Sequence, residues 1–79
     1  MEPWQERYSK NTLKRGQSST YVKNMQTDLN KVGYSCGTPD GIFGSNTETA
    51  VINFQKANKL TADGEVGSGT KPVLYNASH

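Results

Sequence analysis

Two matching stretches decide how this chain is organised: DGIFGSNT at residues 40–47 and DGEVGSGT at residues 63–70. Both follow the pattern D-G-x-[FV]-G-S-x-T. The Asp-Gly pair predicts a tight turn, in which Asp accepts backbone N–H groups and Gly takes a positive φ. The Phe or Val is expected to point into the core, and the Ser to cap the next helix. None of these roles requires a ligand, so the motif by itself predicts structure rather than function.

The repeat extends upstream of the two loops. A helical pattern V-x-x-[MF]-Q precedes each copy, as VKNMQ at residues 22–26 and VINFQ at residues 51–55. The first copy has six more residues between this helical pattern and its loop motif than the second copy has, and the difference is interpreted as extra loop. One helix and one turn cannot bury an apolar stripe alone, so the two units are expected to pack on each other.

Apolar spacing and end signals predict two well-defined helices. The first is expected to start at residues 18–20, whose hydroxyl groups offer N-caps, and to end at Gly33 in a left-handed conformation. The second is expected to start at Ser45, which forms an S-x-x-E capping box with Glu48. It is expected to end at Asn58, which tolerates positive φ.

A third, short helix and two tails complete the prediction. The helix should follow Ser68 or Thr70, with Pro72 in its first turn, where a missing N–H costs little. Residues 1–12 show no sustained period and are interpreted as a tail or linker, although Trp4 and Tyr8 could share a helix face. The predicted fold is an all-α, three-helix bundle over residues 13–75, and residues 76–79 are predicted to be a C-terminal tail.

Composition narrows the class of protein. The 79 residues are only 32% hydrophobic and carry a net charge of +2, with one cysteine and one histidine. An internal disulfide is therefore impossible, and an ordinary Cys/His zinc site is excluded. No apolar run approaches the roughly 20 residues of a membrane span. Residues 1–7 lack the features of a signal peptide, so export would depend on another segment. The nine Lys and Arg residues are scattered, which does not indicate nucleic-acid binding.

The sequence offers no catalytic constellation. The nucleophile Cys36 has only His79 as a possible base, and a chain terminus does not hold catalytic geometry. The carboxylates that could form an acid–base pair are Asp40, Glu48, Asp63 and Glu65. Glu48 is explained by its capping box, and the two aspartates by equivalent turns. We therefore expect a non-enzymatic protein without metal or cofactor.

The ordered motifs resemble the peptidoglycan-binding domain, a small module of bacterial and phage cell-wall hydrolases. The resemblance runs from about Leu13 to Leu74. It rests on Leu13, Gly16, Val22, Met25-Gln26, Leu29, Gly33-Tyr34, Asp40 to Gly44, Thr47-Glu48, Ala50-Val51, Phe54-Gln55, Leu60, Asp63-Gly64, Gly67 and Thr70. It implies a three-helix fold that anchors an attached lytic domain to the wall and has no chemistry of its own.

Four positions depart from the family pattern. Met25 stands where the family usually has Leu, which is a mild change in a core. Ser19 and Lys59 stand where Gly is frequent, and Lys71 where Trp is common. The loss of Gly at Lys59 is expected to loosen the turn after the second helix.

Residues 35–40 also resemble the C-G-x-P-D cysteine switch of matrix metalloproteinase propeptides. In those propeptides the cysteine follows the helical domain, whereas Cys36 lies between the first and second helices. The position favours a plain thiol that is exposed or half-buried.

Only the first loop combines apolar and polar groups, because Glu65 replaces Ile42 in the second. Such a surface suits peptidoglycan, which is rich in hydrogen-bonding groups and partly anionic. The predicted ligand site consists of Tyr34, Asp40, Ile42, Asn46, Thr47, Asn53 and Gln55. Gln55 and Gln26 are equally well explained as exposed helix residues, and Thr47 as a first-turn residue.

The predicted partners are peptidoglycan and a covalently linked catalytic domain, with no nucleic acid and no membrane. We expect a monomer at the cell wall, outside the cell. The alternative is a protein-interaction module on the same fold. The wall moiety bound, and whether the parent is an autolysin, an endolysin or a surface protein, stay open.

Overall fold

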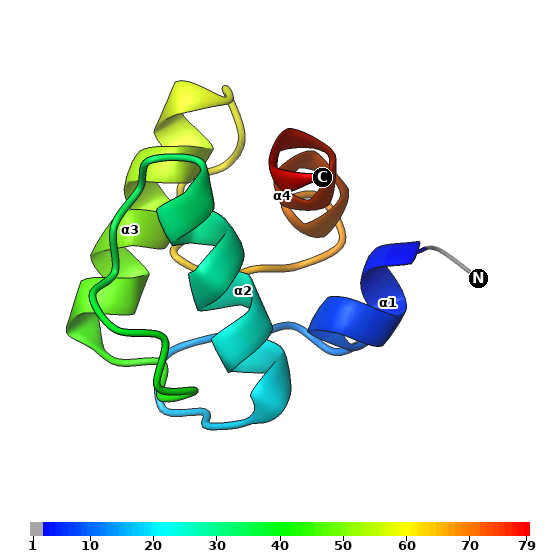
Figure 1. The fold of residues 1–79 in the computed structure, drawn as a ribbon. Coiled ribbons are helices and arrows are strands. Elements are labelled where there is room, and N and C mark those ends of the chain that lie inside the picture. Colours follow the sequence, from blue (N-terminus) through cyan, green and yellow to red (C-terminus); the bar gives the residue numbers. More distant parts are fainter. Residues whose placement is uncertain (1–2) are drawn as a thin grey trace.

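The computed structural model describes residues 3–79, which form four helices: α1 (Pro3–Tyr8), α2 (Thr20–Lys31), α3 (Ser45–Ala57) and α4 (Lys71–Ser78). In Figure 1, α2 runs through the middle, with α3 on one side and α1 and α4 on the other. Helix α2 packs against each of the other three. The all-α class is confirmed, the three predicted helices are α2, α3 and α4, and α1 is additional.

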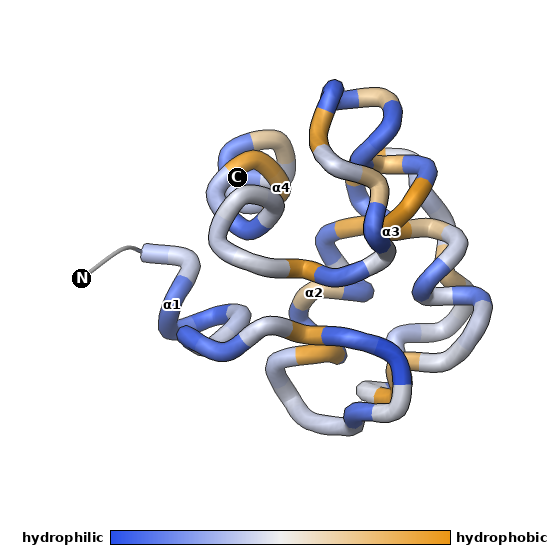
Figure 2. The backbone as a smooth tube through the Cα atoms, turned by 180° about the vertical axis from the view of Figure 1, so that it is seen from behind, coloured by the Kyte–Doolittle hydropathy of each residue, from blue (hydrophilic) through white to orange (hydrophobic). Residues whose placement is uncertain are grey.

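The core is thin and spread over all four helices. Six of its large apolar side chains have no more than 1% of their surface exposed: Tyr8, Met25, Leu29, Phe43, Phe54 and Leu74. Figure 2 shows that apolar positions are short patches between hydrophilic stretches along the backbone. None of the helices between residues 3 and 79 has the length and apolarity needed to cross a lipid bilayer.

Helix α1 lies within the predicted tail of residues 1–12, and the structure differs from that expectation. The side chains of Trp4 and Tyr8 belong to the core, with 9% and 0% of their surface exposed. Arg7 donates to the buried carboxylate of Asp28 through Nε at 2.6 Å and Nη2 at 2.8 Å. The Tyr8 hydroxyl donates to the same carboxylate. Residues 3–8 are therefore a packed element, and only residues 1–2 of the predicted tail lie outside the described residues.

A buried lysine ties α4 to the end of α1. Lys71 is 1% exposed, and its ammonium group donates to the carbonyl oxygen of Ser9 at 2.8 Å and to that of Asn11. The same nitrogen lies 5.4 Å from the ring centroid of Trp4. At this position, where the sequence resemblance implied Trp, the chain uses an ammonium group that donates hydrogen bonds to free carbonyl groups after a helix.

The ends of α2 confirm the prediction. The Ser19 hydroxyl accepts from the Val22 N–H at 3.1 Å, and Gly33 has a φ of 94°. The Tyr34 N–H donates to the Leu29 carbonyl at 2.9 Å, which completes a Schellman motif.

Helix α3 begins and ends where predicted, but the capping residues at both ends differ from the prediction. Gly44 is the N-cap and Ser45 is already helical, so the S-x-x-E capping box does not form. Glu48 instead lies 3.5 Å from Arg15. At the other end Lys59, with a φ of 58°, is the left-handed residue, while Asn58 has a φ of −104°. The Asn58 amide donates to the Phe54 carbonyl at 2.9 Å, which holds Asn58 in the last turn.

The extra residues of the first copy are divided between helix and loop. The C-cap Val32 lies six residues after Gln26, whereas the C-cap Asn58 lies three residues after Gln55. Half of the six-residue difference therefore lengthens α2, and only the other half lengthens the loop.

Residues 13–19 run beside both loops and hold them together. Leu13 and Val66 exchange backbone hydrogen bonds of 3.1 and 2.8 Å, and Phe43 donates to the Gln17 carbonyl at 2.9 Å. Helix α4 follows the second loop with Pro72 in its first turn, as predicted. It continues past the predicted boundary at 75, since Ser78 is buried and donates to Leu74 at 2.8 Å.

Candidate functional site

A buried glutamine at the centre of each repeat determines the shape of the loop that follows. Gln26 is 1% exposed, and its amide nitrogen donates to the Ile42 carbonyl and the Thr47 hydroxyl, both at 2.9 Å. The same nitrogen lies 3.3 Å from an oxygen of Asp40, and the amide oxygen of Gln26 accepts from the Gly41 N–H at 2.9 Å. Both ends of the side chain are thereby satisfied.

The second repeat reproduces this network. Gln55 is 0% exposed and donates to the Glu65 carbonyl at 2.8 Å and to Asp63 and Thr70 at 3.1 Å. Its amide oxygen accepts from the Gly64 N–H at 3.0 Å. The interpretation of Gln26 and Gln55 as exposed helix residues is therefore wrong, because the loops fold back over both of them.

Close backbone contact explains the glycine of the first turn. Gly41 has a φ of 81°, and a Cβ atom there would lie 2.9 Å from the carbonyl oxygen of Ser19. The Ser19 N–H in turn donates to the Gly41 carbonyl at 2.9 Å. The first loop is thus held against the start of α2.

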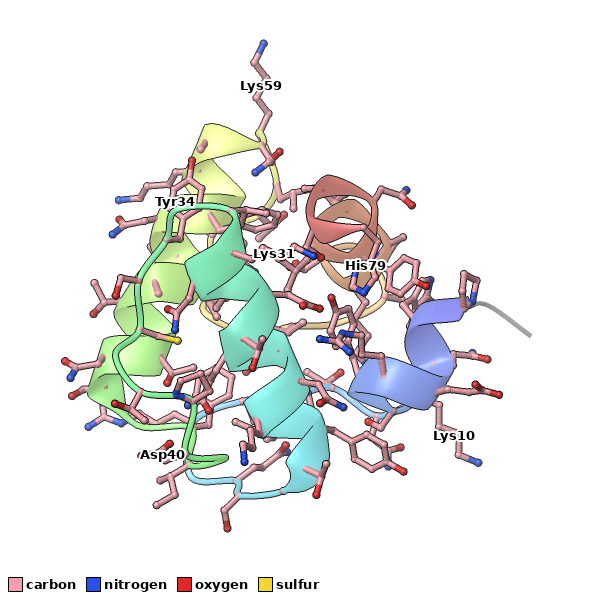
Figure 3. All side chains as sticks on the ribbon, viewed as in Figure 1. Lys10, Lys31, Tyr34, Asp40, Lys59 and His79 are labelled. Carbon is pink, nitrogen blue, oxygen red and sulfur yellow. The ribbon has the colours of Figure 1, made fainter. Side chains whose placement is uncertain are left out.

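Four of the predicted site residues meet in one open pocket of about 250 Å³, which we call the loop pocket. They are Asp40, Ile42, Asn46 and Thr47. Ile42 is 58% exposed, an unusual position for a large aliphatic side chain. The Ile42 N–H and the Gln26 amide lower the pKa of the Asp40 carboxyl, which therefore stays ionised. Figure 3 shows Asp40 on the outer edge of this loop.

The other three predicted residues do not line the loop pocket. Tyr34 is half-buried, and its ring centroid lies 5.6 Å from that of Phe54 in an edge-to-face arrangement. Asn53 is exposed on α3, and Gln55 is the buried centre of the second network. The site is therefore more compact than the sequence spacing suggested.

Four lining residues were missed by the sequence reasoning: Gln26, Cys36, Gly44 and Ser45. The identical V-x-x-[MF]-Q patterns were the available signal for Gln26, since a glutamine at the same point of both repeats has a repeated role. Cys36 is 5% exposed, and its Sγ donates to the Gln26 carbonyl at 3.6 Å. Burial raises the pKa of its thiol, so this cysteine is a protonated thiol in the wall of the pocket. It is buried, whereas the sequence predicted an exposed or half-buried thiol.

The second loop borders a pocket of about 210 Å³, the second-loop pocket, with a different chemistry. Glu65 occupies the position equivalent to Ile42 and is exposed. The two pockets thus share a buried framework and differ in the residue that each presents.

A third pocket, of about 380 Å³, lies where α1 meets the start of α2. We call it the Tyr21 pocket; it is lined by Gln5, Glu6, Ser9, Lys10, Asn11 and Tyr21. Sequence reasoning missed it because residues 1–12 were interpreted as a tail. Within residues 3–79, no group of three or more His, Cys, Asp or Glu side chains is arranged to hold a metal ion.

A helical repeat with shallow pockets at its loops defines a small binding module. Residues 18–74 match the family described as "Putative peptidoglycan binding domain", and the chain belongs to this family.

Similar proteins include two bacterial enzymes. A spore cortex-lytic enzyme of Bacillus cereus is 37% identical over 73 residues, which are 92% of this chain and 28% of that protein. A probable N-acetylmuramoyl-L-alanine amidase of Bacillus licheniformis is 39% identical over 67 residues, 82% of this chain and 19% of that protein. The chain thus spans less than a third of the length of these relatives.

The fold is also found in a solved structure, the SleB N-terminal domain. It superposes with a TM-score of 0.88 at 36% identity, over 91% of this chain and 99% of that one. The chain therefore corresponds to a whole domain of that protein.

Proposed function

We propose that this chain binds peptidoglycan through the loop pocket and acts as a non-catalytic anchor. The observation that carries the proposal is the exposed Ile42 in a pocket of hydrogen-bonding groups, on a chain of this family. A polar ligand with apolar patches can place a methyl or ring face on Ile42. It can also bond to the Asn46 amide and the Ser45 hydroxyl at the rim.

The loop pocket is preorganised for such a ligand. Gln26 fixes Asp40, the Ile42 carbonyl and Thr47 from below, so the rim does not have to be ordered on binding. The proposal keeps Tyr34 and Asn53 as ligand contacts outside the loop pocket. Gln55 instead holds the second loop. Affinity for a shallow site should be modest, and attachment to an enzyme on a repetitive polymer would raise the effective concentration.

Retention on insoluble peptidoglycan tests the site. Ile42→Asp should elute earlier than wild type, because it places a second carboxylate beside Asp40 and removes the apolar contact. Glu65→Ala, at the equivalent point of the second loop, is the matched control and should be retained like wild type. Equal retention of wild type and Ile42→Asp would exclude the loop pocket.

An anchor role requires a second domain that the chain holds at the wall. We propose that the chain is linked to a lytic domain and works at the cell wall outside the cell. Two of its relatives are longer proteins, named as a spore cortex-lytic enzyme and a probable N-acetylmuramoyl-L-alanine amidase. The isolated chain should leave the turbidity of a wall suspension unchanged, and clearing by the chain alone would contradict a purely binding role.

A further inference from the structure

The Tyr21 pocket is larger than the loop pocket and is built mainly from residues before the family match. Its volume is about 380 Å³, against about 250 Å³ for the loop pocket. Five of its six lining residues lie between positions 5 and 11, whereas the family match starts at residue 18. Its chemistry is therefore not explained by the repeat.

The walls of the Tyr21 pocket are held rigidly. The bidentate pair of Arg7 and Asp28 joins α1 to α2, and the Asn24 amide donates to the Arg7 carbonyl at 2.9 Å. The ammonium of Lys71 holds the carbonyl groups of Ser9 and Asn11. A ligand would therefore meet an ordered surface, which lowers the entropic cost of binding.

The lining combines one aromatic ring with uncharged hydrogen-bonding groups. Tyr21 is 44% exposed, and the aromatic pairs within residues 3–79 join other rings and leave this one open. The side-chain amides of Gln5 and Asn11 form no hydrogen bond with another group of residues 3–79. A ring face beside free amide donors and acceptors matches a sugar, which has an apolar C–H face and a rim of hydroxyl and acetamido groups.

The charges disfavour other ligands. Glu6 and Lys10 are both exposed and lie on the same rim, so the pocket has neither the excess of cations that an anion needs nor a cluster of carboxylates for a metal. An apolar peptide side chain would leave the amides of Gln5 and Asn11 without partners.

We propose that the Tyr21 pocket is a second glycan subsite, which stacks a sugar ring of the polysaccharide strand on Tyr21. The inference rests on the proposed function, because the same polymer would occupy both pockets. In Figure 3, Lys10 of this pocket and Asp40 of the loop pocket lie on opposite sides of the start of α2. The whole molecule measures 30 × 26 × 20 Å, so one extended strand can reach both. Two contacts with one strand strengthen binding without a second protein.

The decisive experiment is a chemical-shift titration of the intact chain with two probes, glycan strands freed of stem peptides and the stem peptides alone. Glycan strands should shift the amide signals of Gln5, Asn11 and Tyr21. Tyr21→Ala should weaken glycan binding about tenfold, the loss typical of an aromatic anchor. Tyr21→Phe should keep most of the affinity, because it retains the ring face.

Controls separate a folding defect from a binding defect. Tyr21→Ala removes a half-exposed side chain from a helix that tolerates Ala, so its helical circular dichroism should match wild type. Thr27→Ala, at an exposed position on the same helix outside the pocket, should bind like wild type.

The possible outcomes separate the two pockets. Unchanged glycan affinity in Tyr21→Ala, or shifts at the Tyr21 pocket caused only by stem peptides, would overturn the glycan subsite while binding at the loop pocket upheld the proposed function. Loss of wall retention in Ile42→Asp but not in Tyr21→Ala would overturn the subsite in the same way. Glycan shifts at Tyr21 without any at residues 40–47 would support the subsite and reject the loop pocket.

Discussion

Replacing Gln55 with alanine should unfold a large fraction of the molecules, although Gln55 does not line the loop pocket. The side chain is 0% exposed and makes four hydrogen bonds to the second loop. Those with the Thr70 hydroxyl and the Gly64 N–H are buried, and those with Asp63 and the Glu65 carbonyl are partly buried. Alanine removes all four hydrogen bonds at once and leaves a void.

The loss of folding free energy can be worked out from the two buried hydrogen bonds, those with Thr70 and Gly64. A buried polar group without a partner costs about 1–3 kcal/mol, whereas the partly buried groups can bond to water instead. The two buried groups and the lost packing together give a destabilisation of about 2–5 kcal/mol. A single core of this size supplies roughly 3–5 kcal/mol, so the substitution removes most of the free energy of unfolding.

Urea denaturation followed by tryptophan fluorescence measures this loss. Trp4 is the single tryptophan of the chain and is 9% exposed in the core, so its emission reports on the packed state. The matched control is Asn53→Ala on the same helix, which removes an exposed amide and should change the free energy of unfolding by no more than about 0.5 kcal/mol.

Gln55→Glu sharpens the test, because it keeps the shape and replaces the amide donor with a carboxylate facing Asp63. Burial and this neighbour should raise the pKa of the new carboxyl in the folded state, so stability should be lowest at neutral pH and recover as the pH falls. A loss below about 1 kcal/mol for Gln55→Ala, at an unchanged dependence on urea, would refute the reasoning that this network holds the second loop.

Three further predictions concern other parts of the fold. Lys59→Gly should stabilise the chain by about 0.5–1 kcal/mol, and Gly33→Ala should destabilise it by about 1–2 kcal/mol, both by urea titration, since each position has a positive φ. Asp28→Asn should cost about 1–3 kcal/mol, because it removes the charge that faces Arg7, and the double variant with Arg7→Gln should lose less than the sum of the single losses. The lowered pKa of Asp40 means that its contribution to stability is complete above pH of about 4 and is lost as the pH falls further, so Asp40→Asn should flatten the acid limb of a stability profile.

Apolar spacing and capping residues predicted α2, α3 and α4 correctly, but they predicted the capping of α2 better than that of α3. The N-cap of α2 falls within the predicted residues 18–20, and Gly33 was placed correctly, because a cap and a left-handed glycine depend on neighbouring residues alone. The end of α3 depends on competition: the Asn58 amide bonds back into the helix, and Lys59 is left to take the positive φ. Propensity favoured Asn over Lys, and the hydrogen bond to Phe54 reversed that order.

The site was less predictable, because its framework consists of long-range contacts. Gln26 meets Thr47 across 21 residues, and Arg7 meets Asp28 across 21 residues. A polar residue on a helix gives no local sign of whether a loop will cover it. The equivalence of Gln26 and Gln55 in two repeats was the one sequence feature that could have shown it, since a solvent-exposed residue has no reason to recur with its partners Asp and Thr.

The two repeats separate structural from functional demands. In each repeat, hydrogen bonds within the fold use the polar groups of the Gln, Asp, Gly and Thr residues. The residue after Asp-Gly joins this network only through its backbone, and its side chain is exposed to solvent. That position can vary without disturbing the framework, and it is Ile42 in one loop and Glu65 in the other. One stable framework can therefore present an apolar contact in one loop and a carboxylate in the other. The specificity of the chain should accordingly follow this exposed position rather than the motif that surrounds it.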